Sequence, residues 1–255
     1  MTLSGRVALV TGAAQAAGRG YAIALASAGA SVVVADQFED EGRETVTLIE
    51  KGGGTAGFCA LDVTREESTL AAAAYAVDTF GRLDVLVNNA ATYRATTRTP
   101  MTELTLEQWD KTMAVFVRGP WLMAKSALPH LKRSPCPAII NHTSVAAYGV
   151  DQWLDYGTAR GAVIALTKSM ARELARDRIR VNAVAVGSMG DEAVTLGVVE
   201  REEQMLQTED FKRQLIPRLG SGDDVAGVAV FLAGDGSSYM TGQTLVLDGG
   251  KFFLG

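Results

Sequence analysis

The sequence predicts a single α/β domain built on a doubly wound parallel sheet with helices on both faces. Short apolar, β-branched runs alternate with longer alanine-rich stretches along the 255 residues, and this alternation is typical of βαβ units. Hydrophobic residues make up 47% of the chain and charged residues 21%, which are ordinary values for a globular protein with a full core. No shift in composition marks a boundary, so we expect one domain over residues 1–255.

The expected strands and helices follow one another in order. An unbroken apolar run indicates a buried parallel strand at 7–10. The helix after it, 18–28, stops at Gly29, and glycine suits a helix C-terminus. Further strands are expected at 31–35, 56–60, 85–87, 138–141, 180–184 and 244–247, and further helices at 39–51, 66–80, 105–131, 155–175 and 223–233.

The longest stretch outside this pattern is 187–219, where a charged helix is expected near 200–207. In an open α/β sheet, an insertion beyond the carboxyl end of a strand is where a substrate lid would lie. A surface excursion without that role is the alternative. Both interpretations stay open, and we carry the substrate lid forward as the prediction.

Charge and cysteine usage exclude several functions. The formal net charge of −5 offers no basic surface for nucleic acid or for an acidic membrane. The apolar runs are too short to cross a bilayer, and the first residues run straight into a strand-like stretch rather than a signal peptide. Cys59 and Cys136 lie far apart without a CxxC partner, so we expect reduced thiols, no metal site and a cytoplasmic protein.

A turn of small residues follows the first strand at 11–18, with the sequence TGAAQAAG. Small residues let the backbone turn sharply and approach a pyrophosphate, whose charge the helix N-terminus stabilises. Asp36 ends the second strand, 18 residues beyond Gly18. A carboxylate there can accept hydrogen bonds from both adenosine-ribose hydroxyls and would repel a 2′-phosphate. The pattern predicts NAD rather than NADP, and a helix N-cap is the alternative role for Asp36.

Further motifs complete a pattern that covers essentially the whole chain. Residues 88–91 read NNAA, Ser144 precedes Tyr156, 180–184 reads RVNAV, and TGQ at 241–243 precedes DGG at 248–250. Together with the glycine turn, these motifs resemble the short-chain dehydrogenase/reductase family. The resemblance implies a single-domain Rossmann fold that binds NAD. It assigns the cofactor site to Gly12, Gln15, Ala17, Gly18, Asp36, Asp62, Val63, Asn89, Ala90, Ala91, Tyr156, Arg160, Gly187 and Met189.

The resemblance also implies a catalytic set of Ser144, Tyr156 and the residue at 160. Tyr156 would give or take the hydroxyl proton of an alcohol, and Ser144 would orient that hydroxyl, with a turn serine as the alternative role. The family has lysine at 160, whereas this chain has Arg160. Arginine keeps the positive charge, but its planar guanidinium is not an equivalent group. Lys168 lies twelve residues beyond Tyr156, about 18 Å along the helix axis, so it cannot substitute for the cation.

Other residues depart from the family pattern as well. Phe116 stands where the family has an asparagine that organises a water between the lysine and bulk solvent, and phenylalanine has no polar atom for that relay. Ala16 replaces the middle glycine of the turn. Val186 replaces a proline, and Asp191 replaces a threonine expected near the nicotinamide amide. Arg160 and Phe116 both affect the proton pathway.

Four residues near the catalytic set have expected roles of their own. His142 should point opposite to Asn141 and Thr143 on its strand, which favours a structural role over a proton relay. Asp155 should serve the start of its helix electrostatically. Tyr148 and Trp153 are expected to line a substrate pocket or an interface.

The leading hypothesis is an NAD(H)-dependent oxidoreductase that interconverts an alcohol and a ketone or aldehyde. Two alternatives remain: a protein of the same fold that performs non-redox chemistry with Tyr156, or a catalytically impaired NAD-binding scaffold subunit. The expected partner is a small-molecule alcohol or carbonyl substrate. The resemblance implies a homo-oligomer, a tetramer or dimer, and the apolar tail at 251–255 suits burial against a neighbouring subunit.

Overall fold

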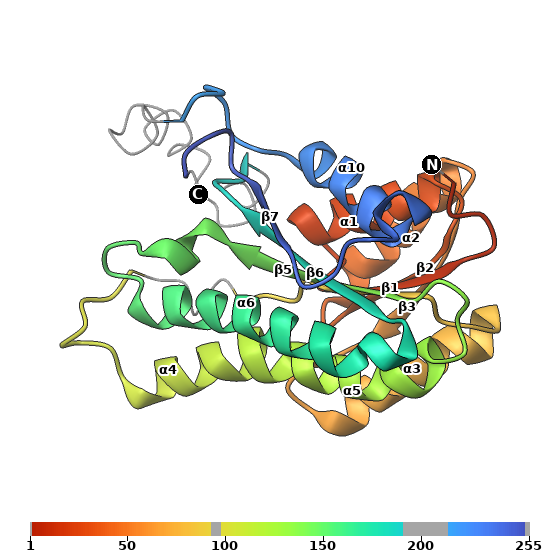
Figure 1. Ribbon diagram of the computed structural model, residues 1–255, viewed down its shortest axis with the longest axis horizontal. Coiled ribbons are helices and arrows are strands. Elements are labelled where there is room, and N and C mark those ends of the chain that lie inside the picture. Colours follow the sequence, from red (N-terminus) through yellow and green to blue (C-terminus); the bar gives the residue numbers. More distant parts are fainter. Residues whose placement is uncertain (1, 93–97, 191–213, 253–255) are drawn as a thin grey trace.

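A computed structural model describes residues 2–92, 98–190 and 214–252. Its described strands form one parallel sheet in the order β3-β2-β1-β4-β5-β6-β7 (Figure 1). This topology confirms the predicted doubly wound α/β fold. The strands are β1 (Val7–Thr11), β2 (Ser31–Asp36), β3 (Thr55–Ala60), β4 (Val85–Asn88), β5 (Ala138–Ser144), β6 (Arg180–Val186) and β7 (Thr244–Leu247).

The helices cover both faces of the sheet, as Figure 1 shows. One face carries α1 (Ala16–Ser27), α2 (Glu39–Lys51) and α10 (Gly222–Ala233). The other face carries α3 (Glu66–Phe80), α4 (Leu106–Met113), α5 (Gly119–Leu131) and α6 (Leu154–Leu174). None of the helices in the described ranges is both long and apolar enough to cross a membrane.

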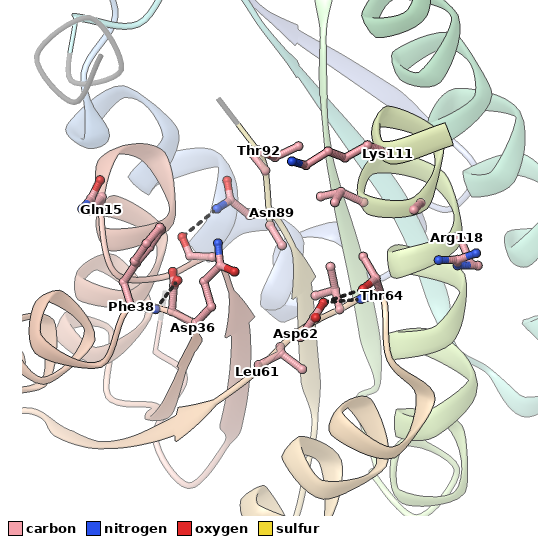
Figure 2. A pocket seen from close by; sticks show the side chains of 17 residues that line it. Gln15, Asp36, Phe38, Leu61, Asp62, Thr64, Asn89, Thr92, Lys111 and Arg118 are labelled. Carbon is pink, nitrogen blue, oxygen red and sulfur yellow. Dashed lines mark hydrogen bonds between the residues drawn. The ribbon is translucent and has the colours of Figure 1, made fainter. Parts of the chain in front are cut away.

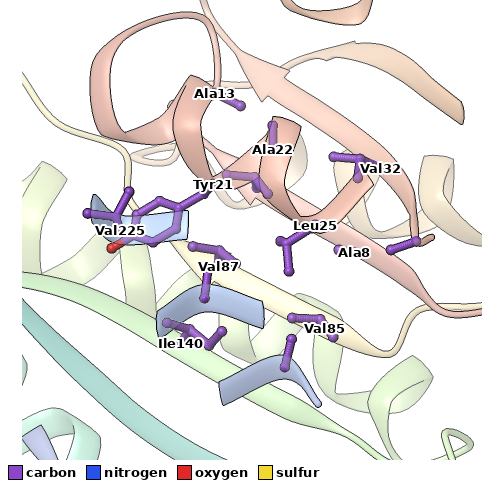
Figure 3. Packing of buried hydrophobic residues seen from close by; sticks show 14 of the residues in the cluster. Ala8, Ala13, Tyr21, Ala22, Leu25, Val32, Val85, Val87, Ile140 and Val225 are labelled. Atoms are coloured by element: carbon purple, nitrogen blue, oxygen red, sulfur yellow. The ribbon is translucent and has the colours of Figure 1, made fainter. Parts of the chain in front are cut away.

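Two apolar cores lie on the two faces of the sheet, and the residues of β1 alternate between them. Ala8 and Val10 pack under α1 and α10, whereas Val7 and Leu9 pack against the helices of the opposite face. This alternation follows from the two-residue period of a strand. Tyr21 of α1 is fully buried in the first of these cores (Figure 3).

The predicted helix at 105–131 is wrong as a single element, because a π-helical turn at Ala114–Arg118 separates α4 from α5. Pro120 has no N–H and therefore cannot donate the α-helical hydrogen bond to the carbonyl of Phe116, four residues back. The N–H of Gly119 donates instead to the carbonyl of Ala114, five residues back. Such turns are frequent at functional sites.

Two strands, β5 and β6, extend beyond their predicted ends by more than one residue. β5 runs on to Ser144 and β6 to Val186, because the two strands pair in register up to these residues. The extension matters for the site, since it carries Ser144 to the carboxyl end of the sheet. The helix expected near 200–207, and most of the insertion at 187–219, lie outside the described residues.

Candidate active site

A cavity of about 1040 Å³ opens at the carboxyl ends of β1 to β4 (Figure 2). The strand order reverses between β1 and β4, and ligands of open α/β sheets bind at such a switch point. Eight of the predicted cofactor residues line the cavity: Gly12, Gln15, Asp36, Asp62, Val63, Asn89, Ala90 and Ala91. The sequence prediction missed nine others: Gln37, Phe38, Leu61, Thr64, Thr92, Lys111, Ala114, Val115 and Arg118.

Four of the missed residues had a signal in the sequence. Lys111, Ala114, Val115 and Arg118 have the spacing i, i+3, i+4, i+7, which places residues on one face of a helix. That face forms the wall opposite Asp36 (Figure 2). Lys111 and Arg118 on this face line the same cavity as the carboxylates of Asp36 and Asp62.

The turn after β1 requires glycine at its two ends. Gly12 has a φ of +66°, and a Cβ there would lie 2.7 Å from Cα of Ala90. A Cβ on Gly18 would clash with the carbonyl oxygen of Gly12. Ala16, at the family's middle glycine position, also has a positive φ of +47°, a conformation that costs an L-residue roughly 1–2 kcal/mol.

Asn89 fixes the turn to the neighbouring strand. Its side-chain amide donates to the carbonyls of Thr11 and Gly12, at 3.1 Å each. The hydroxyl of Thr11 in turn accepts the backbone N–H groups of Asn89 and Ala90, at 3.0 Å each. The end of β4 thus holds the turn in place.

Asp36 is the last residue of β2 and is only 8% exposed. Its carboxylate accepts the backbone N–H of Ala14 at 2.9 Å and that of Phe38 at 3.1 Å. Burial raises the pKa of Asp36 and outweighs these hydrogen bonds, which lower it. The alternative role as N-cap does not hold, because the N-cap of α2 is Phe38.

Tyr156 and Arg160 lie one turn apart on α6 and stack with Phe116 of the π-helical turn. The ring centroids of Tyr156 and Phe116 are 5.4 Å apart, at 84°. Cζ of Arg160 lies 4.2 Å from the centroid of Phe116 and 4.8 Å from that of Tyr156. Trp153 packs against Tyr156, with centroids 5.1 Å apart. The predicted acid–base residue and its neighbouring cation are therefore in contact.

Polar contacts fasten this part of α6 to β5. Arg160 is 4% exposed, and its Nη1 donates to the carbonyl of His142 at 3.1 Å. The hydroxyl of Thr143 donates to the backbone carbonyl of Arg160 at 2.8 Å. Nε of Arg160 is buried and has no hydrogen-bond partner among the described residues, so it keeps a donor for a bound group.

Ser144 lies at the end of β5, beside this stack. Its hydroxyl donates to the carbonyl of Val186 at 3.3 Å and accepts the N–H of Ala146 at 3.2 Å. The helix α6 packs tightly on this turn, since a Cβ on Gly157 would lie 3.0 Å from the carbonyl oxygen of Ala146. Ser144 thus makes the contacts of a turn serine on a segment adjacent to Tyr156, and its catalytic role stays a prediction.

His142 and Asp155 both make buried hydrogen bonds within the protein. The hydroxyl of Tyr21 and Nδ1 of His142 share a hydrogen bond of 3.0 Å, on the α1 side of the sheet. Burial, followed by the charge of Arg160, lowers the pKa of His142 to about 3, so the ring is neutral. Asp155, in the first turn of α6, accepts a hydrogen bond from the hydroxyl of Thr112 at 2.7 Å.

The other six predicted cofactor residues do not line the cavity: Ala17, Gly18, Tyr156, Arg160, Gly187 and Met189. Ala17 and Met189 are buried in the apolar core under the turn, and Gly187 packs against Asp248. Tyr148 packs against Phe252, with ring centroids 6.2 Å apart. Asp191 lies outside the described residues.

The fold and the glycine turn define a dinucleotide-binding protein, and comparisons with known proteins identify its family. A family model described as enoyl-(acyl carrier protein) reductase matches residues 12–251. An uncharacterized oxidoreductase from Thermotoga maritima is 36% identical over 257 residues, covering 98% of this chain and 99% of that protein.

Two solved structures resemble the whole chain. A short-chain type dehydrogenase/reductase from Mycobacterium marinum is 30% identical, with a TM-score of 0.88, and the match covers 99% of this chain and 97% of the other. A 7α-hydroxysteroid dehydrogenase, solved with NADH and 7-oxo glycochenodeoxycholic acid, is 30% identical, with a TM-score of 0.89 and coverages of 98% and 95%. The chain belongs to the short-chain dehydrogenase/reductase family of oxidoreductases.

Proposed function

We propose that this protein is an NAD(H)-dependent oxidoreductase that interconverts an alcohol and a ketone or aldehyde. The observation that carries the proposal is the contact of Tyr156 with a buried cation, Arg160, on a helix fastened to the end of β5. A tyrosine beside a fixed cation can exchange a proton with a substrate hydroxyl, because the cation stabilises the phenolate.

The residues present fit a nicotinamide dinucleotide. Gly12 and Gly18 form a turn that a Cβ would fill, and the cavity beside it ends at Asp36. The carboxylate of Asp36 suits the two adenosine-ribose hydroxyls and repels a 2′-phosphate, which supports NAD over NADP. Asp62 and Val63 would contact the adenine. The buried Nε–H of Arg160 supplies a donor for a hydroxyl of the nicotinamide ribose.

A bound nicotinamide dinucleotide would supply the hydride acceptor for oxidation of the carbinol carbon and the hydride donor for reduction of the carbonyl carbon. In the oxidation direction, Tyr156 removes the hydroxyl proton as the C–H bond breaks, and in reduction it returns that proton to the carbonyl oxygen. Ser144 would turn its hydroxyl from the carbonyl of Val186 to the substrate oxygen and orient that oxygen by a hydrogen bond. Arg160 holds the ribose and offsets the negative charge that develops on Tyr156.

The test is hydride transfer by the purified protein with NAD(H) across a broad panel of alcohols and ketones, followed by NADH absorbance. We expect turnover that Tyr156→Phe lowers by about 10²–10⁴-fold. Calorimetric binding of NAD without any turnover would favour the non-redox or scaffold alternatives. The absence of NAD binding in a folded sample would contradict every cofactor-based role.

Three further parts of this proposal come from the sequence. The insertion at 187–219 would form a substrate lid, the protein would assemble as a homotetramer or homodimer, and it would function in the cytoplasm. Light scattering of the purified protein measures the assembly, and a monomer at micromolar concentration would contradict it.

A further inference from the structure

The two residues that alter the expected proton pathway are in direct contact. Phe116 is 1% exposed and is the buried residue of the π-helical turn. Its ring centroid lies 4.2 Å from Cζ of Arg160, closer than the ring of Tyr156. A change at 116 therefore alters the surroundings of the cation at 160.

The cation has few other partners. Among the described residues, Arg160 forms no ion pair with a carboxylate, and its hydrogen bond from Nη1 goes to a backbone carbonyl, that of His142. A buried cation without a counter-ion needs other stabilisation. The negative face of an aromatic ring supplies it, and it suits a planar, weakly hydrated guanidinium particularly well.

We infer that Phe116 is a positioning residue for Arg160, and that the two residues act as one unit in the reaction. The inference rests on the proposed function. The ring of Phe116 and the carbonyl of His142 together fix the plane and one end of the guanidinium. They hold it against Tyr156 while leaving Nε–H free for the bound ribose.

The same geometry explains why lysine would not serve here. A lysine ammonium is a compact, strongly hydrated charge that needs hydrogen-bond acceptors. Beside the ring of Phe116 it would have the carbonyl of His142 and no acceptor from residue 116. An asparagine at 116 would supply one through its side-chain oxygen. We therefore expect arginine at 160 to function with phenylalanine at 116, and lysine at 160 to function with asparagine at 116.

The test is a double-mutant cycle on the full chain with Phe116→Asn, Arg160→Lys and the variant carrying both changes. We expect each single change to lower kcat at least tenfold, and the double variant to recover at least tenfold over Arg160→Lys alone. Phe116→Asn thus lowers activity beside arginine and raises it beside lysine. A residue that only fills the core would act in the same direction in both backgrounds.

Phe116→Leu is the matched control, because it keeps an apolar side chain and removes the ring face. We expect Phe116→Leu to have a near-normal melting temperature and a kcat reduced by about the same factor as in Phe116→Asn. Phe116→Trp, which keeps an aromatic face at this position, should have a kcat closer to that of the wild type. Wild-type kcat in Phe116→Leu, or additive effects in the cycle, would overturn the inference.

A second measurement separates this inference from the proposed function. NADH affinity is measured by calorimetry for the same variants, without any substrate. If the wild type binds NADH but transfers no hydride, the proposed function fails. Coupling between positions 116 and 160 in NADH affinity would then still support the inference, and independent effects would overturn it.

Discussion

The two halves of the candidate site, the cavity beside the glycine turn and the group of Tyr156, Arg160 and Phe116, differ in how closely they follow the family pattern. At the proposed adenosine half, Gly12, Gly18, Asp36 and Asn89 follow the family pattern, Ala16 departs from it, and the contacts run mainly through the backbone. At the proton-transfer half, two residues depart from the pattern, and the structure brings their side chains together over Tyr156. In the first half, Gly12 and Gly18 keep the backbone of the turn close to the neighbouring strand. In the second half, two side chains differ from the family pattern, and these two side chains are in contact.

The two halves therefore accommodate substitutions in different ways. Ala16 alters the turn, but its φ of +47° shows that the backbone keeps the conformation that a glycine would adopt. Arg160 alters the charge-bearing group itself, and a ring at 116 accompanies it. The predictions below perturb each half, from the largest expected effect to the smallest.

Tyr156→Phe should have the largest effect on the proton-transfer half. Removal of the hydroxyl deletes the acid–base group, so kcat should fall by about 10²–10⁴-fold. Because the ring and its contacts with Phe116 and Trp153 remain, NAD affinity should stay within about twofold of the wild type in calorimetry. Activity close to wild type would remove Tyr156 from the mechanism.

Asp36→Asn should weaken the adenosine half. The amide keeps one acceptor oxygen for a backbone N–H but loses the charge-assisted hydrogen bonds to the ribose, each of about 1.5–3 kcal/mol. NAD affinity should fall by about tenfold or more, and NADP should bind measurably where the wild type excludes it. Calorimetric titration with both cofactors checks this result. An unchanged preference would show that Asp36 does not contact the ribose.

Acid should destabilise the fold through His142, a buried residue of β5. Its pKa is about 3 in the folded chain against about 6.5 when unfolded. Between these values the unfolded chain binds a proton that the folded chain does not. Stability is therefore lost as the pH falls below 6.5, at up to roughly 1.4 kcal/mol per pH unit, and little loss from this group occurs above it.

Urea unfolding between about pH 4.5 and pH 7 measures this slope. His142→Gln keeps an acceptor for the hydroxyl of Tyr21 but cannot titrate, so its slope should be shallower in that window. Parallel slopes for the two proteins would show that other groups dominate acid unfolding.

Ala16→Gly should give the smallest effect, on the turn. It relieves a positive φ that costs roughly 1–2 kcal/mol, while glycine adds about 0.4–1 kcal/mol of unfolded-state entropy. A net stabilisation of about 0.5 kcal/mol and a modest gain in NAD affinity are expected. Ala17→Gly, the neighbouring buried residue in α1, is the control and should destabilise the protein. Equal losses for both variants would mean that Ala16 is unstrained.

The sequence predicts most of the fold, because its signals are local. The apolar runs of β1, β2 and β7 and the glycine positions each depend on neighbouring residues. The break between α4 and α5 was not predicted, although Pro120 marks it, because a proline near the centre of a long apolar pattern does not by itself fix which turn changes. The full length of β5 and β6 depends on their pairing, which is a tertiary contact.

The candidate site was predictable where a motif fixes the backbone. Asp36 and Asn89 lie where the sequence places them, whereas the wall formed by Lys111 and Arg118 depends on how α4 and the π-helical turn pack against α6. The sequence shows Phe116 and Arg160 as two separate departures. Their contact joins positions 44 residues apart, so it becomes visible only in the folded chain.

The most direct test of the account is a crystal structure of the protein with NAD bound. The account predicts that the guanidinium of Arg160 stays against the rings of Phe116 and Tyr156 and donates to a nicotinamide-ribose hydroxyl at about 3 Å. A guanidinium that points away from the ribose, with another side chain holding that hydroxyl, would contradict the role of Arg160 as the replacement cation.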